Sequence, residues 1–463
     1  MRRAATCLLL AVASAQAWAQ TAPNRRPSMV ETVFPDRKGT SANGESAFAL
    51  GASVEQTDNT NRTDVDPQSD TVLGAIAGFR YVRPADSRFS ADIDGTATYY
   101  RYTEDSYPDE LLANMHGKIG YEFMPEHLTW VAEDVFSPLR VDELAADSPN
   151  NRQNFNLAMT GFNYQNLFGD RTAALVAVHY ERADYEVSNA DSQAVVLRAS
   201  LGRLISDHQS LRLGVAGRQI RYASESDFPD YDGQDYSLTW IVSGAYTDLS
   251  IEGGYSNVEF PNSDEDEPLL RVNLQRQMSS RTFLTLTASH ELTGSSDAIH
   301  FDATYGGHGP RTSEVAVNPD PFVLEYLGFN LEYTGNRLYA TLNASTGTDR
   351  YIVSTTDDRD HVYAALQLLW QFSPNWSAGF DYSYEDEDFV QRVDSRSTFR
   401  DATAYAAVFL GARTQVQLSF GRSERDTTFE GGGYVENVGR VLLMYMPGSR
   451  PARGSFEFPR SRR

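Results

Sequence analysis

The sequence predicts an all-β protein: a transmembrane antiparallel up-and-down β-barrel of about 18–20 strands, with short periplasmic turns and long acidic extracellular loops. Three observations predict this class. The chain begins with an export signal, its apolar and polar residues alternate with a period of two, and short and long connections alternate along it. The longest apolar run after the signal, 404–410, is too short for a spanning helix.

The composition narrows the function classes. The chain has 463 residues, a formal net charge of −23 and a single cysteine. The negative charge argues against nucleic-acid binding, so we expect no nucleic-acid partner. One cysteine excludes a disulfide scaffold, a thiolate metal cluster and a dithiol redox pair, and no cofactor motif is present.

The first element is a predicted secretory signal peptide at 1–19. Arg2 and Arg3 form the positive n-region, and residues 4–13 form the apolar h-region. Ala17-Trp18-Ala19 is a small-x-small cleavage site, which places the cut between Ala19 and Gln20. Cleavage removes Cys7, so the mature chain is expected to contain no thiol.

The mature chain divides into three predicted segments. Residues 20–44 lack a strand pattern and form a flexible N-terminal segment, 45–447 form the barrel, and 448–463 form a basic C-terminal tail. Within the barrel, Leu270, Val272 and Leu274 interleave with polar residues, which is the pattern of a strand with one apolar and one polar face.

The connections are of two kinds, as in outer-membrane barrels. The short ones are predicted at 83–88, 124–127, 166–171, 206–210, 247–248, 278–281, 334–337, 373–375 and 411–413. The long ones are predicted near 56–70, 103–110, 137–151, 185–191, 223–235, 261–267, 291–324, 349–360, 385–398 and 424–433. Nine short and ten long connections join twenty strands, and merging one weak hairpin would leave eighteen.

A propeller is the alternative all-β architecture, because the turns recur at intervals of roughly 40 residues. The chain shows two long strands per interval, however, where a propeller blade needs four short ones. Aromatic residues such as Tyr121, Phe123, Trp370 and Phe372 also flank the short turns, which is typical of the aromatic girdle of a membrane barrel.

Polar residues in the alternating segments define a predicted lumen. An Arg or Lys on the lipid face near the bilayer midplane costs about 2–4 kcal/mol, so charged strand residues are expected to face inward. Their mixed signs indicate a hydrated interior rather than a filter for one sign of ion; the alternative is a network of ion pairs that fills the interior. The candidate pore-lining residues are Arg80, Asp92, Asp94, Lys118, Glu122, Glu133, Arg198, Arg212, Arg218, Glu252, Arg271, Asn273, Gln275, Glu332, Asn343 and Asp381.

A barrel of this size is too wide for wall side chains to fill, so water or an inserted segment must occupy it. Two segments are candidates for such a plug: residues 20–44 and the longest loop, 291–324. The acidic loops have two interpretations, either solvated tips or cation-bridged contacts with lipopolysaccharide phosphates.

No catalytic motif is present, and we expect no enzymatic activity. His290 beside Glu291, and His361 beside Asp360, are the two acid–base pairs that the sequence offers. Neither has a nucleophile nearby in the sequence, so we interpret both as inert.

The region after the first strand reads Asp58-Asn59, then Arg62, then Ser69-Asp70. This arrangement, the signal peptide and the hairpin rhythm resemble the type 2 family of β-barrel porins, outer-membrane proteins associated with exopolysaccharide and capsule export. The resemblance implies a Gram-negative outer membrane and a conduit or accessory role in polysaccharide export. Independently of the resemblance, Tyr339 and Tyr363 are expected near the wide polar lumen, where they could stack on sugar rings. One departure is a basic tail after Tyr445, where many such barrels end on an aromatic residue.

The expected partners follow from this interpretation. They are outer-membrane lipid and lipopolysaccharide, the outer-membrane barrel assembly machinery, and, by the resemblance, polysaccharide and periplasmic export proteins. A general diffusion porin and a non-channel structural surface barrel remain the alternative functions.

Overall fold

The computed structural model is a closed antiparallel sheet of twenty strands. It describes residues 45–83, 88–142, 145–223, 226, 228–294, 318–391, 395–411, 413–428 and 432–447. The predicted signal peptide, N-terminal segment and C-terminal tail lie outside these residues. The strand count is at the upper end of the predicted range, and the predicted fold class is confirmed.

The strands follow one another with few interruptions. The first ten are β1 (Glu45–Thr57), β2 (Asp70–Arg83), β3 (Phe89–Tyr102), β4 (Glu110–Met124), β5 (Leu128–Arg140), β6 (Arg152–Phe168), β7 (Thr172–Tyr185), β8 (Ser192–Ser206), β9 (Gln209–Tyr222) and β10 (Tyr231–Ser243). The second ten are β11 (Thr247–Glu259), β12 (Asp264–Ser279), β13 (Thr282–Thr293), β14 (Phe322–Thr334), β15 (Leu338–Tyr351), β16 (Arg359–Ser373), β17 (Trp376–Phe389), β18 (Arg396–Phe409), β19 (Thr414–Thr427) and β20 (Tyr434–Tyr445).

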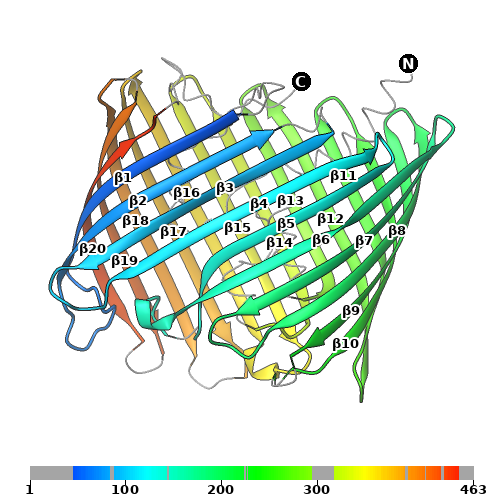
Figure 1. The fold of residues 1–463 in the computed structure, drawn as a ribbon, viewed down its shortest axis with the longest axis horizontal. Coiled ribbons are helices and arrows are strands. Elements are labelled where there is room, and N and C mark those ends of the chain that lie inside the picture. The colour runs from blue at the N-terminus through cyan, green and yellow to red at the C-terminus, as the bar shows by residue number, and fades with distance from the viewer. Residues whose placement is uncertain are drawn as a thin grey trace.

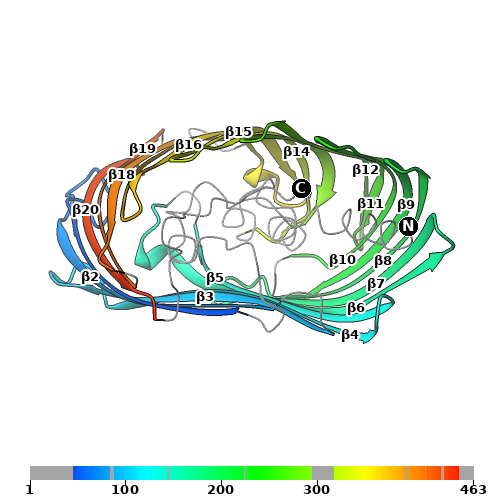
Figure 2. The ribbon, with the colours of Figure 1, turned by 90° about the horizontal axis from the view of Figure 1, so that it is seen from above.

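Each strand pairs antiparallel with the next, and β20 pairs with β1 to close the ring (Figure 1). Viewed from above, the ring is flattened into an oval (Figure 2). Closure pairs the backbone groups of the first and last strands, which is what a spanning sheet needs in a medium that offers no hydrogen bonds.

The outer face of the barrel is apolar. Phe48, Leu213 and Leu418 are 55%, 59% and 60% exposed, and each alternates along its strand with more polar or smaller residues. Side chains that face each other across an antiparallel pair lie on the same face of the sheet, so the register extends this apolar surface from strand to strand. Such a surface is stable in lipid and costly in water.

Aromatic residues lie on this surface at the short-turn end. The rings of Tyr121 and Phe123 are 5.1 Å apart, and those of Trp370 and Phe372 are 6.1 Å apart. Phe123 and Trp370 are about half exposed. This arrangement fits the girdle at headgroup depth that the sequence predicts.

All nine predicted short connections are present, at the upper end in Figure 1. The one predicted at 247–248 is displaced: the turn is at 244–246, where Gly244 N–H donates to the carbonyl of Thr247 at 2.8 Å.

The ten long connections are shorter than predicted, because the strands continue past the apolar band. Asp264–Glu267 belong to β12 and Glu385–Asp388 belong to β17. Acidic residues can extend a strand where its edges are hydrated, which an apolar alternation pattern does not reveal.

The seam between the first and last strands is short. Residues Leu50 to Thr57 of β1 pair with β20, whereas the β1–β2 register runs from Glu45 to Thr57. At the long-loop end the seam is reinforced by side chains, because Asn437 donates from both its backbone N and its Nδ2 to the Asp58 carboxylate, each at 2.7 Å.

Helical structure in the described ranges is limited to two single turns, η2 (Pro149–Asn151) and η3 (Thr355–Asp357). Among these residues no helix is long and apolar enough to cross a membrane. Both turns lie within the outline of the ring when it is seen from above (Figure 2).

Candidate functional site

The face opposite the apolar surface carries the candidate pore-lining residues. Arg271 lies between Leu270 and Val272 along β12, and Asp381 lies between Phe380 and Tyr382 along β17. The register joins Arg212, Thr239, Glu252 and Arg271 in one row across β9 to β12, so these side chains share a face.

A first cluster of opposite charges forms on β3, β4 and β5. Lys118 Nζ is 3.4 Å from Glu133 Oε2, and His116 Nε2 is 3.3 Å from Glu133 Oε1. Asp94 lies 3.9 Å from the other nitrogen of His116. The register places Asp92 opposite Lys118 and Arg80 opposite Asp94. Positive and negative groups therefore alternate around this part of the wall.

A second cluster forms on β11, β12 and β13. Arg271 Nη1 lies 3.4 Å from Glu252 Oε2, and Arg271 Nε donates to Glu291 Oε2 at 2.7 Å. One guanidinium thus lies between two carboxylates, and Glu291 is almost fully buried. In both clusters groups of opposite charge lie within reach of one another, and the second holds one positive group against two negative ones. A wall that mixes both signs in this way disfavours a strong selection for one sign of ion.

The remaining candidates are spread along the wall. Arg218 Nη2 is 3.6 Å from Asp235 and donates to the Leu292 carbonyl at 3.2 Å. Three predicted residues bond to other polar side chains: Asn273 to Thr287, Asn343 to Asn330, and Glu332 to Thr334. The strand register places the other four predicted residues beside these neighbours: Arg198 opposite Ala216, Glu122 opposite Thr129, Gln275 opposite Thr285, and Asp381 opposite Gln367. Their role as pore lining remains a prediction.

The two histidine–carboxylate pairs are separated by the strand geometry. His290 contacts Glu267 at 3.3 Å and Glu325 at 3.2 Å, while Glu291 bonds to Arg271. Asp360 pairs with Arg350 at 2.5 Å, and His361 lies opposite Gly347 in the register. Successive residues of a strand point to opposite faces, so sequence neighbours on a strand do not form a catalytic pair.

Tyr363, one of the two tyrosines expected to stack on sugar rings, is only 5% exposed. Little of its ring is therefore available to a passing polymer. A cluster of aromatic residues that the sequence did not reveal lies at the long-loop end instead. The ring of Tyr222 is 5.8 Å from Phe228 and 6.4 Å from Tyr231, which is 5.7 Å from Phe260.

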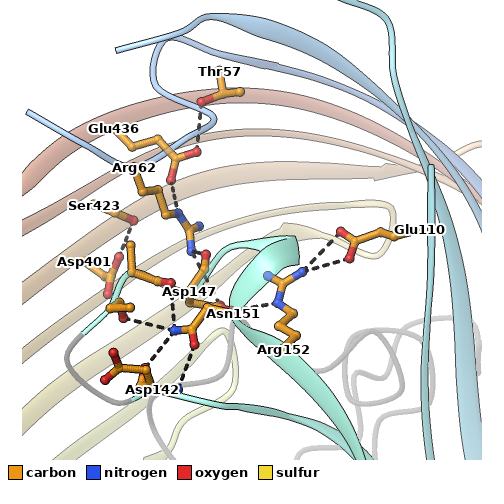
Figure 3. A network of polar contacts seen from close by, with 12 residues as sticks. Thr57, Arg62, Glu110, Asp142, Asp147, Asn151, Arg152, Asp401, Ser423 and Glu436 are labelled. Carbon is orange, nitrogen blue, oxygen red and sulfur yellow. Dashed lines mark hydrogen bonds and ion pairs between the residues drawn. The ribbon is translucent and has the colours of Figure 1, made fainter. Parts of the chain in front are cut away.

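A polar network ties the β5–β6 loop into the mouth of the barrel (Figure 3). Arg62, in the β1–β2 loop, donates from Nε to Glu436 Oε2 at 2.9 Å and from Nη1 to the Asp147 carbonyl at 2.6 Å. Glu436 also accepts from Thr57 at 2.9 Å. The Arg62 and Glu436 side chains are only 15% and 5% exposed.

Arg152 continues the network on the other side of the loop. Its Nε donates to Asp147 Oδ1 at 2.7 Å, and its Nη1 donates to Glu110 Oε1 at 3.2 Å. Asn151 closes the loop on itself by donating to the Asp142 carbonyl at 2.7 Å and accepting from the Asp142 N–H at 2.8 Å. Arg62 belongs to the β1–β2 loop and Asp147 to the β5–β6 loop, so their contact joins two loops that β3 and β4 separate along the wall.

Arg62 keeps its charge under this burial. Burial lowers the pKa of Arg62, but Tyr434, Glu436 and Asp147 outweigh it and hold the pKa well above its ordinary value. The attachment of the loop is therefore insensitive to pH across the physiological range.

The segment from Asp58 to Asp70, which carries the family resemblance, has a structural role here. Asn59 Nδ2 donates to the Val435 carbonyl at 2.9 Å, and Asp70 accepts from the Ser106 hydroxyl and from the Glu104 N–H. Together with Asp58 and Arg62, these residues join the first loop to β20, to the β3–β4 loop and to the β5–β6 loop.

The described ends of the β13–β14 connection also leave the wall. Tyr222 OH donates to the Pro319 carbonyl at 2.7 Å, and Asn318 Nδ2 donates to Asp357 at 2.7 Å. The end at 318–321 thus bridges β9 and the β15–β16 loop. The centre of the predicted plug loop, 295–317, lies outside the described residues.

Asp320 anchors the segment 318–321 through hydrogen bonds, and its ionisation makes the stability of the protein depend on pH. Its Oδ2 accepts from the N–H groups of Val353 and Ser354 at 2.8 and 2.7 Å, and burial raises its pKa from 3.8 to about 6. Folding therefore favours the protonated form. The contribution of Asp320 to the free energy of unfolding is fully present below the pKa that Asp320 has in the unfolded chain. It is lost as the pH rises through about 6.

We expect Asp320→Asn to gain stability relative to wild type as the pH is raised from about 4 to about 7, because the amide never ionises. Denaturant midpoints in detergent micelles, measured for both proteins across this range, provide the test. Asp105→Asn, at an exposed loop position, is the matched control and should show a constant difference from wild type. A constant difference for Asp320→Asn as well would contradict the prediction.

No protein-family model matches the chain, and no curated protein matches it either. Solved structures do. A variant of the ferric enterobactin receptor of Pseudomonas aeruginosa is similar with a TM-score of 0.50 and 10% identity, covering 88% of this chain and 81% of that chain. The siderophore receptor PirA of Acinetobacter baumannii is similar with a TM-score of 0.49 and 7% identity, covering 88% of this chain and 81% of that chain. The FrpB iron transporter of Neisseria meningitidis is similar with a TM-score of 0.45 and 8% identity, covering 87% of this chain and 82% of that chain.

The likeness to the enterobactin receptor concerns the fold alone. Combined with the closed ring, the apolar outer face and the aromatic residues at the short-turn end, it identifies an outer-membrane β-barrel protein, as predicted. By the usual layout of such barrels, the short turns are periplasmic and the long loops extracellular.

Proposed function

We propose that this barrel is a conduit or accessory for the export of exopolysaccharide or capsular polysaccharide across the outer membrane. The observation that carries the proposal is the inner wall, where Lys118–Glu133 and Glu252–Arg271–Glu291 pair opposite charges within reach of one another. A polar wall that mixes charges of both signs suits a hydrated polymer better than a small ion of one sign. The resemblance of the Asp58–Asp70 segment supports polysaccharide as the polymer.

In each of the two histidine–carboxylate pairs that the sequence offers, the two side chains point to opposite faces of their strand, so neither works as an acid–base pair. We therefore propose a transport role without an enzymatic step.

A gene deletion tests the export role. We expect the deletion strain to lose most of its surface polysaccharide, and a plasmid copy of the wild-type gene to restore it. An unchanged amount of surface polysaccharide would contradict the proposal.

The purified protein distinguishes the alternatives. A general diffusion porin would give a steady conductance in planar bilayers together with a normal polysaccharide phenotype in the deletion strain. A structural surface barrel would give neither conductance nor phenotype. For the proposed conduit, the mixed signs of the wall predict only a small shift of the reversal potential under a salt gradient. A strongly shifted potential would contradict the argument from a wall of mixed sign.

A further inference from the structure

One sector of the inner wall is apolar. Ala49 of β1, Ile76 of β2, and Leu442 and Met444 of β20 pack together with Met446. We call these five residues the inner apolar patch. They alternate with the lipid-facing residues of the same strands and share a face with Arg80 and Glu55, so the patch faces the interior.

The patch is shielded from water. Ile76, Leu442 and Met444 are 4%, 5% and 2% exposed, whereas Leu443, between the last two on the lipid face, is 46% exposed. A side chain on the inner wall of a twenty-stranded barrel has wall neighbours only at its flanks, because the bore is too wide for the opposite wall to reach it. Ala47 and Phe409 pack against its flanks but are themselves only partly buried, so a layer over the patch would account for the rest of its burial.

The floor of the patch is suited to close packing. The register places Met444 and Ile76 on either side of Gly51. A Cβ at Gly51 would clash with the Met444 sulfur, so the methionine lies across the glycine. Two flexible methionines beside glycine and alanine form a surface that adapts to an apolar segment.

The chain immediately before β1 has the composition to cover this surface. Within residues 20–44, which lie outside the described part, Met29, Val30, Val33 and Phe34 place four apolar side chains in six residues. This run is too short to span a membrane or to fold alone, so burial of its apolar side chains needs a surface supplied by the rest of the protein.

Its reach is also sufficient. Phe34 is eleven residues from Glu45, where β1 begins, and an extended chain covers about 3.3 Å per residue. Ala49 is four residues into β1, so the segment needs only to fold back over the start of its own strand. Arg37 and Lys38 would then pass the short-turn rim, where exposed Asp92 lies level with Glu45 across β2.

We propose that residues 29–34 of the N-terminal segment dock on the inner apolar patch and line or narrow the periplasmic half of the lumen. The occupant is a part of this chain and not a separate partner. The C-terminal tail starts at the same rim, but it is dominated by arginines and offers only Phe456 and Phe458. The inference concerns the lumen itself and does not depend on what the barrel transports.

Disulfide trapping tests the docking, since the predicted mature chain contains no cysteine of its own. The full-length double variant Phe34→Cys/Ile76→Cys, assembled in outer membranes and oxidised, is expected to form an intramolecular disulfide in most molecules. The disulfide is detected by mass spectrometry of tryptic fragments. Heat-modifiable migration on a denaturing gel confirms that each variant has folded.

Two pairings serve as controls. Phe34→Cys/Leu443→Cys places the second cysteine on the lipid face at the same depth and should not cross-link. Phe456→Cys/Ile76→Cys tests the tail as the occupant. Cross-linking through Phe456→Cys instead of Phe34→Cys, equal cross-linking at the lipid-face position, or folded protein with no cross-link at all would each overturn the proposal.

A second measurement needs no cross-link. In the single variant Ile76→Cys, removal of residues 22–40 is expected to raise the rate of labelling by a water-soluble maleimide about tenfold, because the thiol becomes accessible. An unchanged rate would overturn the proposal. The labelling rate and the polysaccharide phenotype of the gene-deletion strain report on different claims. If the labelling rate rises but the deletion strain keeps its surface polysaccharide, the docking stands and only the proposed export role is contradicted.

Discussion

Replacing Arg62 with alanine is expected to destabilise the barrel by about 3 kcal/mol, because the change leaves Glu436 buried without its cation. The Glu436 side chain is 5% exposed, and Arg62 contributes its Nε–H to the carboxylate and its Nη1–H to the Asp147 carbonyl. Removing one member of such a buried pair costs more than the pair contributes, since the remaining charge loses water and partner together.

The measurement is the free energy of unfolding in denaturant, followed by tryptophan fluorescence in micelles. Limited proteolysis adds a local readout, because release of the β5–β6 loop should speed cleavage within 141–151. Arg182→Ala is the matched control: its partner Asp184 is exposed, and the Arg182 side chain is 56% exposed. Loss of this exposed pair should leave the free energy of unfolding nearly unchanged, because solvent screens it. Equal losses for Arg62→Ala and Arg182→Ala would contradict the assigned role.

Leu418→Arg is expected to destabilise the barrel by about 2–4 kcal/mol in a bilayer, because it places a guanidinium on the lipid face. Leu418 is 60% exposed on β19 and lies opposite Ala406 of β18. Arg422, on the same face further along the strand, shows where this surface becomes polar. Leu418 therefore lies well within the apolar band.

The adjacent residue provides the control. Gln417→Arg changes a side chain on the opposite face, where the lumen is proposed, and its cost should be below about 1 kcal/mol. Folding efficiency into lipid vesicles and denaturant midpoints report both variants. A similar penalty for the two substitutions would contradict the assignment of the polar face to a hydrated lumen, and with it the predicted pore-lining set.

The barrel could be predicted from local patterns because its chemistry repeats locally. Alternation at Leu270–Gln275 defines two faces without any knowledge of the neighbouring strand. The turns are visible because a periplasmic turn is brief and polar between apolar strand ends. Where that contrast disappears, as at Asp264–Glu267, the strand boundary was placed too late.

The mouth of the barrel could not be predicted in the same way. Arg62 and Glu436 are far apart in the sequence, and no periodicity relates them. Their contact depends on ring closure, which brings the first loop against the last strand. The segment around Arg62 was distinguished in the sequence only by its family resemblance, which gave no indication that Asp147 or Arg152 would bind to it.

The inner wall shows a similar limit. The sequence predicted polar residues inward, but alternation alone did not reveal that Ala49, Ile76 and Met444 form an apolar sector among them. β20 has apolar residues on both of its faces, which in a sequence is the pattern of an ordinary strand buried on both sides. Only the register shows which of the two faces lipid covers.

The short seam between β1 and β20 has a consequence for the order of assembly. Its contacts join residues separated by nearly the whole chain, such as Asp58 and Asn437, so the entropic cost of closing that loop precedes any gain from the contacts. Every hairpin can form before this step, and none depends on it. The open sheet is thus the natural precursor of the ring, with two unpaired edges exposed until the last strand arrives. The polar side chains of Asp58, Thr57 and Glu436 then stabilise the closed ring at the end of the seam where backbone pairing stops.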